Sequence, residues 1–116
     1  MCDCDLEPPT VFRETKRKAR KDHKCNDCRG RIVAGETYTE TFGVWDGDAR
    51  RFKRCADCDE FISWAHTQDD CLCLEVGDVL NSTLESFADR GEQPLLNECR
   101  TRIKAIRNKR REPVAA

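Results

Sequence analysis

Four cysteines in two CxxC pairs are the residues whose spacing most clearly indicates chemistry. Cys25 and Cys28 form the first pair, Cys55 and Cys58 form the second, and 26 residues separate them. Two residues between thiolates let the backbone turn and aim both sulfurs at one tetrahedral ion, so each pair supplies half of a zinc site. The alternative is a set of core thiols or redox pairs. Zinc held by four thiolates has no open position for water, so we predict a structural site and no catalysis.

Four further cysteines form two CxC pairs, Cys2 with Cys4 and Cys71 with Cys73. A CxC pair cannot close a tetrahedron alone, but two pairs together supply four thiolates. We therefore predict a second zinc ion that ties the N-terminal segment to the segment after the first helix. Two alternatives stay open: His66 replaces one thiol, or these cysteines hold no metal at all.

The segment between the CxxC pairs predicts a β-hairpin within residues 36–54. Its first half is rich in strand-forming residues, and Asp46-Gly47 is a strong hairpin-turn dipeptide. A helix is expected from Cys55 to about His66, since Phe61 and Ala65 fall at helical spacing. Gly30 is expected to take a positive φ as the chain leaves the first pair.

A CxxC turn, called a zinc knuckle, is followed over residues 20–66 by the predicted hairpin and by a helix that carries the last two ligands. This order resembles the treble-clef zinc finger, the group that includes LIM-type half-domains. Small phage and prophage zinc-binding proteins carry similar runs, here RKARKDHKC, IVAGETY and WDG. The resemblance implies a fold and a metal, and it suggests a host factor or a defence system as partner. Treble clefs of the HNH nuclease kind carry a histidine in the hairpin, and residues 36–54 contain none.

Two amphipathic helices are predicted after the zinc module. Apolar residues recur at helical spacing over 76–90, with Gly91 as terminator, and again from Pro94 to about Lys109, where Cys99 is expected to be a core thiol. The predicted fold is thus a small α+β zinc-stabilised domain. It comprises a two-zinc treble-clef module over 1–75, a helical hairpin over 76–111 packed on it, and a disordered tail over 112–116.

Charge is strongly segregated along the chain, although the formal net charge is −1. Residues 10–24 carry seven basic and two acidic side chains, residues 67–98 carry eight acidic side chains and one arginine, and residues 99–111 carry seven basic side chains and no acidic one. Either the basic segments face an anionic partner, or they fold against the acidic stretch.

The main functional prediction is a non-enzymatic module that binds another protein, because a net acidic chain is poorly suited to non-specific duplex binding. The alternative is nucleic-acid binding through residues 13–24 and 100–111. Its candidate contacts are Lys16, Arg17, Arg20, Arg107 and Arg110.

The sequence also predicts where the protein is located and what His23 does. No basic and apolar leader opens the sequence, and no apolar run approaches the roughly 20 residues of a membrane span. We therefore expect a reducing cytoplasm, that of the host if the protein is phage-encoded. His23 could replace a cysteine ligand, but a partly exposed strand residue is the favoured interpretation.

Overall fold

The hairpin predicted between the cysteine pairs is the centre of the structure, a computed structural model that describes residues 9–68, 72, 74–89, 91 and 93–111. Strands β4 (Thr37–Trp45) and β5 (Asp48–Arg54) pair antiparallel, with Trp45 opposite Asp48. Asp46 and Gly47 both have positive φ, 49° and 82°, as a two-residue hairpin turn of type I′ requires. The predicted hairpin and its turn are confirmed.

A third strand, for which the sequence analysis made no prediction, joins this hairpin. β1 (Val11–Lys18) pairs antiparallel with β4, so the strand order is β1-β4-β5, and every residue of β1 is exposed. A second, two-stranded sheet consists of β2 (His23–Lys24) and β3 (Arg31–Ile32). The chain between β2 and β3 carries the first CxxC pair, so this short hairpin is the knuckle.

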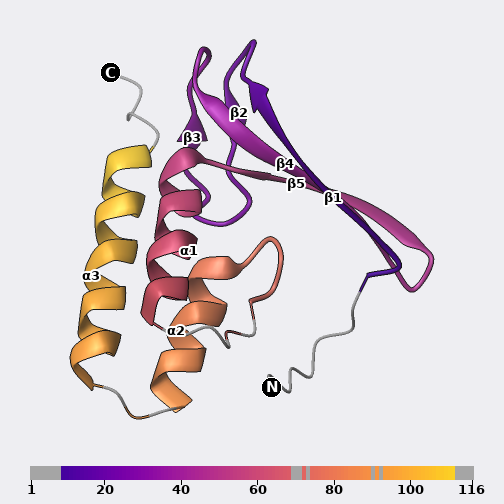
Figure 1. Ribbon diagram of the computed structural model, residues 1–116. Coiled ribbons are helices and arrows are strands. Elements are labelled where there is room, and N and C mark those ends of the chain that lie inside the picture. The colour runs from indigo at the N-terminus through magenta and orange to yellow at the C-terminus, as the bar shows by residue number, and fades with distance from the viewer. Residues whose placement is uncertain (1–8, 69–71, 73, 90, 92, 112–116) are drawn as a thin grey trace.

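Three helices in the described part of the chain lie together beside one end of the large sheet, and the β4–β5 turn projects away from them (Figure 1). They are α1 (Ala56–Gln68), α2 (Val79–Asp89) and α3 (Gln93–Arg110). The helix predicted from residue 76 begins only at Val79. Gly77 has a φ of 89°, and the Asp78 carbonyl accepts the Ser82 N–H at 3.1 Å, so the first helical turn starts after this bend.

The helices enclose most of the apolar core. Phe61 of α1, Phe87 of α2 and Ile103 of α3 are buried, and Trp64 packs edge-on against Phe87. Cys99 is fully buried, which confirms it as a core thiol. The same cluster continues without a break to the CxxC cysteines.

Glycine is required at position 30 for a reason other than the expected positive φ. The residue that takes the left-handed conformation after the first cysteine pair is Arg29, with a φ of 64°, and Gly30 does not have a positive φ. Instead, a Cβ added to Gly30 would lie 2.4 Å from Cβ of Arg110 and 2.8 Å from its carbonyl oxygen. The last turn of α3 therefore packs directly on the backbone of the knuckle, and only glycine leaves room for it.

Gly30→Ala is expected to destabilise the protein by about 1 to 3 kcal/mol, because the added methyl group must displace the end of α3. Urea unfolding followed by circular dichroism measures the change. Ser63→Ala, on the exposed side of α1, is the control and should shift the free energy of unfolding by less than about 0.5 kcal/mol. Equal midpoints for the two variants would contradict the close packing of α3 on the knuckle.

Candidate metal centre

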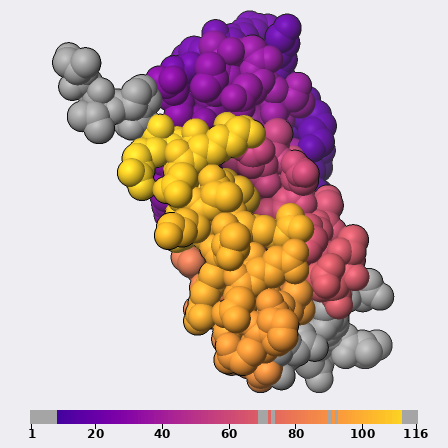
Figure 2. All heavy atoms as spheres, turned by 90° about the vertical axis from the view of Figure 1, so that its left-hand side faces the viewer, coloured from indigo at the N-terminus to yellow at the C-terminus, as the bar shows by residue number. Residues whose placement is uncertain are grey.

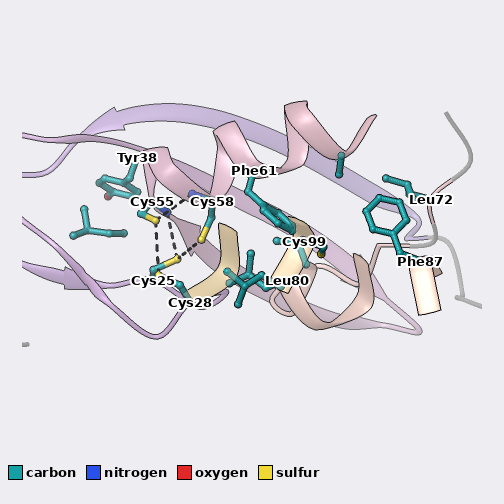
Figure 3. Close-up of a cluster of buried hydrophobic side chains, with 14 of the residues drawn as sticks. Cys25, Cys28, Tyr38, Cys55, Cys58, Phe61, Leu72, Leu80, Phe87 and Cys99 are labelled. Atoms are coloured by element: carbon teal, nitrogen blue, oxygen red, sulfur yellow. Dashed lines mark hydrogen bonds between the residues drawn. The ribbon is translucent and has the colours of Figure 1, made fainter. Parts of the chain in front are cut away.

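The two CxxC pairs converge on one buried point. Cys25 and Cys28 come from the knuckle, Cys55 immediately precedes α1, and Cys58 lies in the first turn of α1. The four sulfur atoms all lie within 4.8 Å of one another, and all four residues are buried. Figure 3 shows these side chains meeting within the apolar cluster, with Tyr38 on one side and Phe61 on the other.

The sulfur spacing fits one tetrahedral zinc ion. The Sγ atoms of Cys25 and Cys58 are 3.8 Å apart, as are those of Cys28 and Cys55. A regular tetrahedron with zinc–sulfur bonds of about 2.3 Å separates its sulfurs by about 3.8 Å. A disulfide bond needs a separation of about 2.05 Å. The cluster is therefore compatible with a zinc-binding site and not with two disulfides.

Backbone amides are aimed at the sulfur atoms. The Gly30 N–H donates to Sγ of Cys28 at 3.3 Å, the Cys55 N–H donates to Sγ of Cys25 at 3.4 Å, and the Cys58 N–H donates to Sγ of Cys55 at 3.4 Å. Hydrogen bonds to the charged form of a group favour that form. The knuckle and the start of α1 thus stabilise thiolates, the state in which cysteine binds metal.

The four thiols oppose one another's ionisation. Hydrogen bonds from Cys28, Cys55 and Cys58 lower the pKa of Cys25, whereas hydrogen bonds with Cys25 and Cys28 raise the pKa values of Cys55 and Cys58. Four negative charges cannot share this buried volume unaided. A divalent cation would resolve the conflict, since metal coordination displaces the thiol proton, which is released to solvent, and the positive charge of the ion offsets the thiolates.

Arg110 links the end of α3 to this centre. Its guanidinium donates from Nε to Asp57 at 2.8 Å, and from one terminal nitrogen to Glu36 at 2.9 Å and to the Arg31 carbonyl at 3.0 Å. Burial opposes the charge, but Glu36, Cys55 and Asp57 outweigh it and raise the pKa of Arg110.

Arg110 is only 7% exposed. The sequence analysis includes it among candidate nucleic-acid contacts, but the structure directs its guanidinium inward. No local sequence signal distinguishes it from its exposed basic neighbours, because the burial arises only when α3 packs on the knuckle.

Asp27, inside the first CxxC pair, links the knuckle to α2. Its carboxylate accepts the Val79 N–H at 3.0 Å, at the first residue of α2, and Nε of Arg54 at 3.2 Å. Burial raises the pKa of Asp27, although these two partners act in the opposite direction. The sequence analysis missed this residue, since an aspartate between two ligands gives no sign of the helix that it will cap.

Both histidines lie apart from the four-cysteine cluster. His23 is half-buried in β2, with Nδ1 3.0 Å from Nζ of Lys53 and its ring against Tyr38, which confirms the strand interpretation. His66 is exposed near the end of α1.

The four-cysteine cluster is the one metal-ligand group found among the described residues. The predicted second site, with Cys2, Cys4, Cys71 and Cys73, lies outside them.

The other candidate nucleic-acid contacts lie on the surface. Lys16 pairs with Asp59 at 2.7 Å and Arg17 with Glu40 at 3.4 Å. Arg20 and Arg107 are exposed.

Comparisons with known proteins add no relative. No protein-family model matches the chain, and neither a curated protein nor a solved structure does. The treble-clef and phage resemblances therefore stay predictions. Of the helices in the described residues, none combines the length and the apolar character that crossing a membrane would need.

Removal of zinc is expected to unfold the protein, because a structural zinc contributes on the order of 10 to 16 kcal/mol. Far-UV circular dichroism during titration with a chelator should show a loss of structure that added zinc reverses. Cys25→Ser should lower the zinc content, and Cys99→Ser, the same change at a buried cysteine outside the cluster, should not. Retained structure in the metal-free protein would contradict a structural role.

The second site is tested by the metal stoichiometry of the full chain. Native mass spectrometry is expected to show two zinc ions in the wild type and one after Cys2→Ser with Cys4→Ser, because that change removes half of the second ligand set. Deletion of residues 1–5 should likewise cost one zinc and speed hydrogen exchange over residues 67–75. One zinc per chain in every variant would show that the second site does not exist.

Proposed function

We propose that this protein is a non-enzymatic module that folds around structural zinc and binds another protein. The observation that carries the proposal is the closure of the four sulfurs of Cys25, Cys28, Cys55 and Cys58. With four thiolate ligands, no position is left for a water or a substrate, so the ion stabilises the fold and performs no chemistry. A second ion at Cys2, Cys4, Cys71 and Cys73 would likewise stabilise the fold.

A treble-clef arrangement is the fold that we propose for the zinc module. A knuckle between β2 and β3, a hairpin of β4 and β5, and a helix with Cys58 in its first turn follow one another in that order. On the resemblance to phage proteins, the partner is a host protein. Because zinc-binding thiolates must stay reduced, we place the protein in a cytoplasm.

Internal pairing of the basic segments supports a protein partner. Lys16 pairs with Asp59 at 2.7 Å, and Arg17 pairs with Glu40 at 3.4 Å. Lys109 and Arg110 both pair with Asp57. Part of the positive charge that could attract a phosphate backbone is thus used within the fold. The acidic partners in these pairs lie outside the acidic stretch over residues 67–98.

A second candidate function, nucleic-acid binding, is favoured by one face of the large sheet. The strand register places Arg13, Arg17 and Arg51 on the same face as Phe42, opposite to the face where Lys16 reaches Asp59 of α1. The guanidinium carbons of Arg13 and Arg51 lie 5.2 and 5.0 Å from the centroid of the Phe42 ring. Guanidinium and aromatic planes on an open sheet are suited to stacking on single-stranded bases.

Capture from a lysate of the cells to which the protein is native separates the two functions. The immobilised zinc-loaded protein is expected to retain a discrete protein after nuclease treatment, because the contact is between proteins. In a mobility-shift assay, the zinc-loaded protein should form no tight, salt-sensitive complex with oligothymidylate.

Nucleic-acid binding would be favoured over protein binding if the protein bound oligothymidylate tightly, if this affinity fell steeply with salt, and if Arg13→Gln with Arg51→Gln abolished it. Lys18→Gln with Arg50→Gln is the matched control, because it removes the same charge from the other face of the same two strands.

A further inference from the structure

A groove runs between α2 and α3. Its volume is about 360 Å³. It is lined by Asn81 and Leu84 of α2, by Arg100, Ile103, Lys104, Arg107 and Asn108 of α3, and by Arg111, which directly follows α3. Arg102 and Ile106 lie on the flank of α3 that turns toward Phe61 of α1. The groove is therefore on a different flank from α1. Figure 2 shows the side of the molecule that α3 forms, where no other described segment covers this helix.

The basic side chains of α3 fall into two groups. Arg102 lies over the Trp64 ring at 4.3 Å, and Lys109 and Arg110 pair with Asp57, so these three serve the packing of α3 on the rest of the protein. The others, Arg100, Lys104, Arg107 and Arg111, line the groove. They follow one another at spacings of four, three and four residues, which places them in one stripe along the helix.

The groove combines this stripe with an apolar floor. Ile103 is 4% exposed and Leu84 is half-buried, and both line the groove together with the basic side chains and the amides of Asn81 and Asn108. Residues three and four apart on a helix are separated by about 4.5 and 6 Å along its axis. Acidic side chains at the same spacing on a second helix would therefore meet the stripe in register, while apolar side chains beside them would contact the floor.

A nucleic acid fits this groove less well. Its phosphates would leave the apolar floor uncovered, and among the residues that the structure describes no aromatic side chain lines the groove to stack on a base.

We propose that the groove between α2 and α3 is the docking site for an acidic amphipathic helix of the partner protein. The inference rests on the proposed protein-binding function and names the surface and the chemistry of the partner. Such a helix would add a fourth helix beside α1, α2 and α3.

The probe for this site is a fluorescein-labelled peptide of about 20 residues, the length of α3. It carries leucine every three or four residues, glutamate at the flanking positions and alanine elsewhere, and fluorescence anisotropy measures its binding to the full zinc-loaded chain. We expect micromolar binding that Lys104→Gln with Arg107→Gln weakens about tenfold, because two direct charge contacts are lost. A peptide with lysine in place of every glutamate should not bind.

The matched control is Arg102→Gln with Lys109→Gln, which removes the same charge from the other flank of the same helix. Lys18→Gln with Arg50→Gln, far from α3, is a second control in case the first perturbs packing. Both should bind the peptide within about twofold of the wild type, and zinc content and circular dichroism verify the fold of each variant.

Three outcomes would overturn the docking site: equal weakening by the groove pair and by a folded control pair, equal binding of the lysine peptide, or displacement of the peptide by oligothymidylate at matched concentration. If the wild type still captures a protein after nuclease treatment, the proposed function stands and a different surface carries it. If it captures none, the proposed function itself fails.

Discussion

The meeting of four sulfur atoms is the constraint on which the rest of the structure depends. The knuckle and the start of α1 are far apart in the sequence, and two of their sulfur–sulfur distances are 3.8 Å. With charged residues at 37% of the chain, the apolar core is small. A zinc site of this type contributes a free energy comparable to the whole stability of a domain, on the order of 10 kcal/mol. A zinc ion bound by these four cysteines would therefore replace much of the core that the composition lacks.

Buried polar residues extend this constraint to the C-terminal helices. Asp27 holds the start of α2 from within the knuckle, and Arg110 holds the end of α3 against Asp57, beside the ligand Cys58. Neither contact adds much net free energy, because burying a charge costs nearly as much as its pairing returns. What such contacts provide is a unique arrangement, since any other packing of α2 or α3 would leave a buried charge without a partner.

Local features were predicted well from the sequence, and features that need the whole fold were not. The knuckle spacing, the Asp46-Gly47 turn and the helix after Cys55 each depend on a few neighbouring residues, and all lie where expected. The role of Gly30 and the burial of Arg110 depend on a contact between segments 80 residues apart. Strand β1 was equally hard to assign, because all its side chains are exposed and no apolar alternation marks it.

The dipoles of α1 and α3 explain why the basic end of α3 lies at the metal centre. The N-terminus of α1 carries partial positive charge toward the thiolates of Cys55 and Cys58, and Asp57 in its first turn adds a negative charge there. The C-terminus of α3, with its own partial negative charge, needs cations, which Lys109 and Arg110 supply. Arg107 lies in the same last turn but lines the groove with Lys104, whereas Lys109 and Arg110 pair with Asp57. The positive charge of Lys104 and Arg107 is therefore the charge that the proposed partner helix would meet.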